Sequence, residues 1–275
     1  MTKINFLSPI KAFLLSATFL LINITQLSAQ SQQSNSTKIH FVQPILDRQP
    51  ENRGAPRDRR GAGTRGDCPV SSITNKPLTA LVPLVSKTVN QKQVTTGTDT
   101  TQYVLSLTTD KHPTFWFYVP YLPKNINSVK FVLLNEKNNS LTKEPIPITL
   151  SNTPGVIRIS VPTTEKPLEI GQYYHWYFLI DCNPQSRSED IAVEGLVQRI
   201  IPKDELTRRL QTATPRQRVA IYAQAGIWQD ALTTLGELRA RQRQDANLAT
   251  DWKDLLDSVG LEDISTEAIA PCCTL

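Results

Sequence analysis

The chain has 275 residues, 39% of them hydrophobic and 20% charged, which excludes disorder throughout and allows one large or two small domains. Its 11 Gly and 19 Pro follow no fixed period, so a fibrous chain is excluded. Without Lys3 and Lys11, which lie in a segment that we expect to be removed, 28 Lys and Arg stand against 25 Asp and Glu. This small excess does not indicate a nucleic-acid-binding protein.

Residues 1–29 have the pattern of a secretory signal peptide. Lys3 and Lys11 precede an apolar run from Ala12 to Ile24, and the polar stretch after it ends at Ala29, where we place the cleavage. An uncleaved signal anchor is the alternative. No later segment has the roughly 18 apolar residues of a membrane-spanning helix. We therefore expect a periplasmic or extracellular protein without a transmembrane segment in its mature chain.

Residues 30–67 are rich in Arg, Gln and Ser and are expected to form a flexible leader. Only the patch from Ile39 to Leu46 offers apolar side chains for burial. The segment from Arg48 to Gly66 carries six Arg, which favours either a solvated linker or contact with an anionic envelope surface.

Residues 68–202 show short β-branched and aromatic runs between turn residues, which is typical of an all-β domain. Their number suits an immunoglobulin-like antiparallel β-sandwich. The expected strands are Leu78–Val82, Gln102–Thr108, Thr114–Val119, Ser128–Asn135, Ile146–Leu150, Gly155–Val161, Gln172–Ile180 and Ile191–Ile201. The runs Phe115–Val119 and Tyr173–Ile180 are apolar on both faces and are the best candidates for central strands.

Ten of the nineteen aromatic residues lie in Phe115–Tyr121 and Tyr173–Phe178. Because side chains alternate across a strand, one set packs the sandwich while the other points away from it. The candidate outward-pointing side chains are Trp116, Tyr118, Tyr174 and Trp176. Covered by the helical end they are ordinary core residues, and left open they form a stacking platform for sugar or peptide.

Residues 203–261 change to a helical period and are expected to form a small C-terminal α-helical subdomain, followed by a tail, 262–275. Thr214, Pro215 and Gln217 predict a capped helix start, and Gly226 predicts its end. One apolar stripe begins at Trp228 and continues with Ala231, Leu232, Leu235 and Leu238. Another apolar stripe includes Trp252, Leu255, Leu256 and Val259 and is stopped by Gly260. The fold class is thus α+β with segregated sheet and helix regions.

Four cysteines in an exported chain favour oxidation. We expect a disulfide between Cys68 and Cys182, which lie at edges of the strand region and would close a loop of about 115 residues. Cys272 and Cys273 are adjacent in the tail, where free thiols, a vicinal disulfide and an intermolecular link all remain open.

Catalytic, cofactor and metal signals are weak. The match to a dinucleotide fingerprint at Gly61–Gly66 lacks the strand before it and the helix after it, so no cofactor is expected. No metal-ligand spacing is present, and His175 is expected to be a core or half-buried histidine. The acidic residues Asp181, Glu189, Asp190 and Glu194 form a loose group that is expected to be a solvated loop.

Several segments together resemble an uncharacterised family of exported proteins, known mainly from photosynthetic bacteria, called domain of unknown function 928. The matching segments are Arg53–Pro56, Gly63–Gly66 with Cys68, Leu78–Pro83, His112–Pro120, Thr153–Gly155, Tyr173–Trp176, Val193–Gly195 and Tyr222–Leu232. The resemblance implies export and supports the Cys68–Cys182 pair, but implies no activity. Tyr222, Gly226, Trp228, Ala231 and Leu235 also resemble a single tetratricopeptide unit.

The sequence therefore favours a non-enzymatic protein that binds another protein of the bacterial cell envelope. The alternative is a module that binds carbohydrate or cell wall through an aromatic sheet face. Neither nucleic acid nor catalytic turnover is expected.

Overall fold

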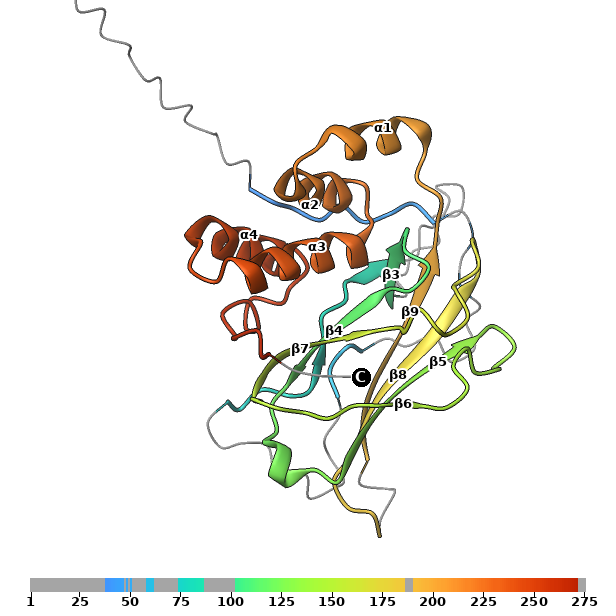
Figure 1. The fold of residues 1–275 in the computed structure, drawn as a ribbon, viewed down its shortest axis with the longest axis vertical. Coiled ribbons are helices and arrows are strands. Elements are labelled where there is room, and N and C mark those ends of the chain that lie inside the picture. Colours follow the sequence, from blue (N-terminus) through green and yellow to red (C-terminus); the bar gives the residue numbers. More distant parts are fainter. Residues whose placement is uncertain are drawn as a thin grey trace, which may run out of the picture. The chain divides into compact units, whose positions relative to one another are not determined.

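Two β-sheets and a following group of helices make up the part of the chain that the structure describes (Figure 1). This computed structural model describes residues 38–46, 48, 50, 58–61, 74–86, 102–185 and 190–271, all within one unit that spans residues 38–275. Strands precede helices along the chain, which confirms the predicted α+β class with segregated regions.

The larger sheet has six strands in the order β2-β3-β9-β8-β5-β6. Their bounds are Leu84–Ser86 for β2, Gln102–Thr108 for β3, Ser128–Asn135 for β5, Ile146–Pro147 for β6, Tyr173–Asp181 for β8 and Ile191–Arg199 for β9. β3 and β9 pair in parallel, with Leu105 opposite Leu196, whereas the other described pairs are antiparallel. The prediction of a purely antiparallel sandwich is wrong for this pair, and an immunoglobulin-like topology stays a prediction.

The smaller sheet has the order β1-β4-β7, with β1 at Thr79–Ala80, β4 at Thr114–Val119 and β7 at Gly155–Ser160. A short 3-10 helix, Pro123–Asn125, follows β4. Both strands that were predicted to be central are interior: β4 lies between β1 and β7, and β8 lies between β5 and β9.

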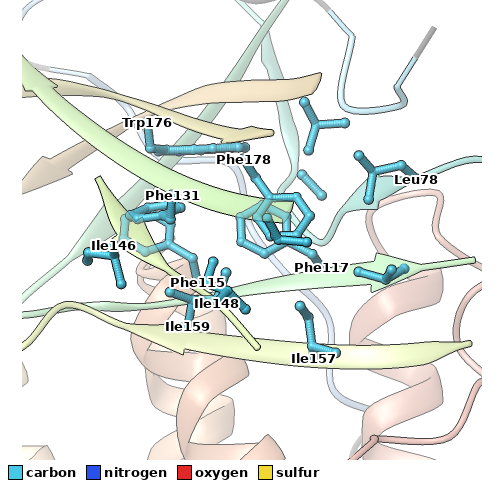
Figure 2. Close-up of a cluster of buried hydrophobic side chains, with 14 of the residues drawn as sticks. Leu78, Phe115, Phe117, Phe131, Ile146, Ile148, Ile157, Ile159, Trp176 and Phe178 are labelled. Carbon is cyan, nitrogen blue, oxygen red and sulfur yellow. The ribbon is translucent and has the colours of Figure 1, made fainter. Parts of the chain in front are cut away.

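The inner faces of the two sheets enclose the main hydrophobic core, which Figure 2 shows in close-up. Phe117 of β4 stacks on Phe178 of β8 with ring centroids 4.3 Å apart. Phe115 approaches Phe131 of β5 at 4.9 Å. Aromatic rings thus supply much of the contact that holds the sheets together.

The outer face of β4 is also buried, beneath the helices, because Trp116 belongs to a second hydrophobic cluster with Trp228 and Trp252. The helices are α1 (Asp204–Thr212), α2 (Pro215–Gln224), α3 (Trp228–Arg241) and α4 (Ala246–Asp257). Figure 1 shows α3 between α2 and the end of β3. The side chain of Trp116 reaches α3, where its Nε1 donates to Thr233 Oγ1 at 3.1 Å.

The helix ends follow the predicted signals. Thr214 caps α2, its hydroxyl accepting from the Gln217 amide, while Gln217 Oε1 accepts from the Thr214 amide. Gly226 then takes a left-handed conformation with φ of 74°, which an L side chain rarely adopts and which lets α3 begin two residues later. The predicted capped start of α2 and the predicted role of Gly226 at its end are therefore confirmed.

The prediction of a flexible leader is wrong for residues 38–46, because Ile39 and Phe41 are buried against the helices. The Val42 amide donates to the carbonyl of Ala223 at 3.0 Å, and the Phe41 amide donates to Ser258 Oγ at 3.1 Å. A few apolar side chains can therefore dock a mostly polar segment when they face an apolar helix surface.

The Arg-rich part of the leader also makes contacts within the chain. Arg59 is buried and donates to the carbonyls of Val82, Val259 and Gly260, and burial lowers its pKa to about 10. Arg60 forms a two-pronged pair with Asp263 at 2.8 and 2.9 Å. These two guanidinium groups therefore hold the leader to the C-terminal segment. The Arg-rich part of the leader was expected to be a solvated linker or to contact the envelope surface, and neither expectation describes the buried Arg59.

Candidate binding cavity

The four aromatic side chains proposed as a binding surface are buried: Trp116, Tyr118, Tyr174 and Trp176 are at most 3% exposed. Trp116 and Tyr118 lie beneath the helices. Tyr174 and Trp176 point into the core between the sheets. Of the two alternatives for these rings, ordinary core residues and an open stacking platform, their burial supports the first. The outward direction expected for Tyr174 and Trp176 is wrong, because both face the core between the sheets.

A polar cavity of about 470 Å³ lies instead where α2 and α3 meet the connection between β3 and β4. We call it the α2–α3 cavity. Its walls carry threonine hydroxyls, a tyrosine and side chains of both charges. The lining residues are Thr108, Thr109, Asp110, Pro113, Thr114, Pro215, Arg218, Tyr222, Gln229, Asp230, Thr233, Thr234, Glu237, Leu238 and Arg241. Cavities of this volume are in the range that holds small ligands, about 300–1,000 Å³.

Gln229, in the first turn of α3, lines the cavity with a side chain that is only 1% exposed. Neither its amide oxygen nor its amide nitrogen has a hydrogen-bond partner among the described residues. A buried primary amide without partners costs about 1–3 kcal/mol. Folding therefore leaves one donor group and one acceptor group of this lining residue unused.

Asp230, the next residue, also lines the cavity, and its hydrogen bonds join α3 to the end of β3. Its carboxylate accepts from Thr108 Oγ1 at 2.8 Å, from the Thr109 amide at 3.1 Å and from the Thr109 hydroxyl. Burial raises the pKa of this carboxyl group despite these hydrogen bonds. The pKa of Tyr222 is also raised, mainly by burial and secondly by the nearby charge of Asp230.

We expect Asp230→Asn to remove a pH dependence of stability. Because burial raises the pKa of Asp230 above 3.8, the folded protein binds this proton more tightly than the unfolded chain does. The free energy of unfolding of the native protein should therefore fall as the pH rises from about 4 through the folded-state pKa. Urea titrations between about pH 4 and 7 measure this slope, which the variant should lack.

The exposed Asp204 at the start of α1 provides the matched control, and Asp204→Asn should keep the native slope. An unchanged slope in Asp230→Asn would contradict the assignment of this pH dependence to Asp230.

His175 and Glu194 lie together on the outer face of the larger sheet, outside the α2–α3 cavity. His175 Nε2 is 2.7 Å from Glu194 Oε2, and His175 Nδ1 is 3.0 Å from the hydroxyl of Tyr177. Burial and the charge of Glu194 raise the pKa of Tyr177 to about 12. Glu194 belongs to β9, so its predicted place in a solvated loop is wrong, while the half-buried position expected for His175 is confirmed.

The other predicted candidates do not join this cluster. Asp181 accepts from Asn127 Nδ2 at 2.8 Å at the far end of β8, and Glu189 lies outside the described residues. Among the residues that the structure describes, no group of His, Cys, Asp and Glu could hold a metal ion. Cys182 is not a free thiol, but Cys68, Cys272 and Cys273 lie outside the described residues, so the Cys68–Cys182 disulfide stays a prediction.

No residue of the cavity was predicted as a site residue, although Tyr222, Gln229 and Asp230 lie in the segment Tyr222–Leu232 that resembles the family. An acidic residue in the first turn of a helix, such as Asp230, is favourable at any helix start and so does not mark a site. Gln229 carried no signal, because a glutamine beside an apolar stripe is usually exposed. Only the packing of α3 against β3 and β4 reveals that this glutamine is buried.

Apposed sheets, a helical layer on β4 and a polar cavity beside it define an α+β protein with a preformed cavity. A family model described as Domain of Unknown Function (DUF928) matches residues 60–269. The chain therefore belongs to this family, which confirms the family resemblance noted above. A search of curated proteins gave no match. None of the described helices is long and apolar enough to cross a membrane.

Proposed function

We propose that this chain is a non-enzymatic binding protein of the bacterial cell envelope that takes a peptide segment of another protein into the α2–α3 cavity. The observation that carries the proposal is that Gln229, a residue of the cavity lining, has a buried amide without hydrogen-bond partners among the described residues. The envelope location rests on the signal-peptide pattern of residues 1–29.

A primary amide complements a peptide bond. Its N–H donates to a carbonyl oxygen while its oxygen accepts from a backbone N–H, so Gln229 can satisfy both groups of a peptide unit. A bound peptide would then recover the free energy lost by burying the glutamine without partners. The threonine hydroxyls of the cavity add groups that both donate and accept.

The charges around the cavity favour a segment with both signs of charge. Arg218 and Arg241 are exposed on the α2 and α3 sides, and Asp110 is exposed on the strand connection. Arg218 Nε donates to the carbonyls of Leu210 and Ala213, which holds its guanidinium in place. Oppositely charged groups on one rim orient a partner and select against a partner of the wrong charge pattern.

The carbohydrate alternative is not retained, because it required an exposed aromatic sheet face and those rings are buried. Tyr222 is the one aromatic residue among the described residues that line the cavity.

We expect Gln229→Leu to raise stability while removing binding. The change deletes a buried amide that lacks partners, so the free energy of unfolding should rise by about 1 kcal/mol. Peptides selected on the native protein from a random displayed library should bind this variant at least tenfold more weakly. Urea titration and fluorescence titration with the selected peptides measure the two effects.

Gln224→Leu makes the same chemical change at an exposed position of α2 outside the cavity lining, and it should leave peptide affinity unchanged. The native protein and both variants should then be used for affinity capture from envelope extract, followed by mass spectrometry. Selected peptides that bind Gln229→Leu as tightly as the native protein, or a library that yields no binding peptide, would overturn the proposal.

A further inference from the structure

A second cavity, of about 450 Å³, lies on the side of the helical layer where α3 ends and brings together three arginines from separate parts of the chain. Arg158 comes from β7, Arg239 from the last turn of α3 and Arg243 from the segment after α3. We call it the arginine cavity. The remaining walls are mostly apolar and are formed by Trp116, Ala240, Ala268, Ile269, Ala270 and Pro271. None of these lining residues is acidic.

Arg239 is half-buried, and no described residue forms an ion pair with it. Its Nη1 has no hydrogen-bond partner among the described residues and is shielded from solvent. Its guanidinium lies 5.2 Å from the centre of the Trp252 ring, so an aromatic face holds it in place. Burial lowers its pKa, and no carboxylate opposes that effect. The charge of this guanidinium, beside a cavity that Arg239 lines, therefore favours an anion there.

Arg158 and Arg243 add positive charge at the same cavity. Arg158 Nη1 is 3.9 Å from Glu237, at the outer limit of an ion pair, and its side chain is 47% exposed. Glu237 also pairs with Arg241, at 3.4 Å, and so is shared between two guanidinium groups. The three lining arginines therefore carry a charge of +3, which one shared carboxylate at the edge does not neutralise.

We propose that the arginine cavity binds a phosphomonoester, with its dianionic phosphate on the arginines and its organic group against the apolar wall. A dianion matches the excess positive charge better than a single carboxylate does. Guanidinium groups also bind phosphate oxygens through paired, directional hydrogen bonds. Ile269 and Ala270 lie on the wall that would contact the organic group. This site is separate from the α2–α3 cavity and does not depend on the peptide proposal.

The test is calorimetric titration of the purified protein with phenyl phosphate, with benzoate as the monoanionic comparison. Phenyl phosphate should bind at least tenfold more tightly than benzoate, and its affinity should fall as salt is added. Arg239→Gln should weaken binding of phenyl phosphate at least tenfold. Arg158→Gln, which leaves the packing against Trp252 untouched, should also weaken it and keeps the test valid if the first variant unfolds.

Arg209→Gln is the matched control, because Arg209 is exposed on α1 and lines neither cavity. Vesicles of phosphatidylcholine with and without phosphatidic acid, whose headgroup is a phosphomonoester, separate a lipid source from a soluble one. Binding in either arm that Arg158→Gln weakens and Arg209→Gln does not supports the site. The absence of binding in both arms, or equal binding by all variants, would overturn it.

Discussion

Trp228→Ala is expected to lower the free energy of unfolding by about 3–5 kcal/mol, the range for deleting a large core aromatic. Trp228 is completely buried at the start of α3, as predicted from its place at the head of an apolar stripe. Its Nε1 donates to the carbonyl of Leu81 at 2.7 Å, and Phe41 meets its ring edge-on at 5.2 Å. The variant therefore loses packing against the helices, the leader and the strand region at once.

Trp228→Phe separates the two contributions. Phenylalanine keeps part of the ring contact but cannot donate to Leu81, so it should cost about 1–3 kcal/mol, the penalty for an unpaired buried carbonyl. Urea titrations measure both variants. A loss below about 1 kcal/mol for Trp228→Ala would contradict the buried position of this side chain.

Gly195→Ala is expected to destabilise the protein by about 3 kcal/mol through overpacking. Gly195 of β9 lies directly opposite Trp176 of β8. A Cβ at this position would meet Trp176 Cζ2 at 2.1 Å and Val104 Cγ1 at 2.8 Å. The indole is completely buried and lies 5.6 Å from the ring of Phe117, so it has no room to move away.

Gly171→Ala provides the comparison. Gly171 has a φ of 77°, but a Cβ there would meet nothing within 4 Å, so the cost should be the conformational one alone, about 1–2 kcal/mol. Combining Gly195→Ala with Trp176→Phe should cost less than the sum of the two single changes, because the smaller ring frees space for the new methyl group. Strict additivity in denaturant titrations would contradict the proposed clash.

Local patterns were sufficient to predict most strands. The observed bounds of β3, β4 and β5 are those expected from the sequence, because each has a clear run of β-branched or aromatic residues ended by turn residues. The prediction of a flexible leader was wrong for residues 38–46, because burial of Ile39 and Phe41 depends on an apolar helix surface more than 170 residues away. Local composition does not reveal such a surface.

The direction of side chains in β8 was harder to predict. Tyr173, His175 and Tyr177 alternate with Tyr174, Trp176 and Phe178, so both faces are aromatic and hydrophobicity alone cannot select the inner one. The parallel pairing of β3 with β9 likewise depends on partners about 90 residues apart. The candidate cavity depends on a similar long-range contact between Thr109 and Asp230, and so it could not be predicted.

The contact of the leader with the last helix affects the order in which the chain can fold. Phe41 and Ser258 are separated by 217 residues, and Arg59 and Gly260 by 201. Because synthesis proceeds from the amino end, Ile39 and Phe41 are made early, but the helical partners of the leader, from Ala223 to Ser258, emerge much later. Contacts between such distant residues form slowly, since a long loop must close first. A nascent or truncated chain that ends before α2 lacks α2, α3 and α4 and therefore exposes apolar side chains at its beginning, where chaperones or other unfinished chains can bind them.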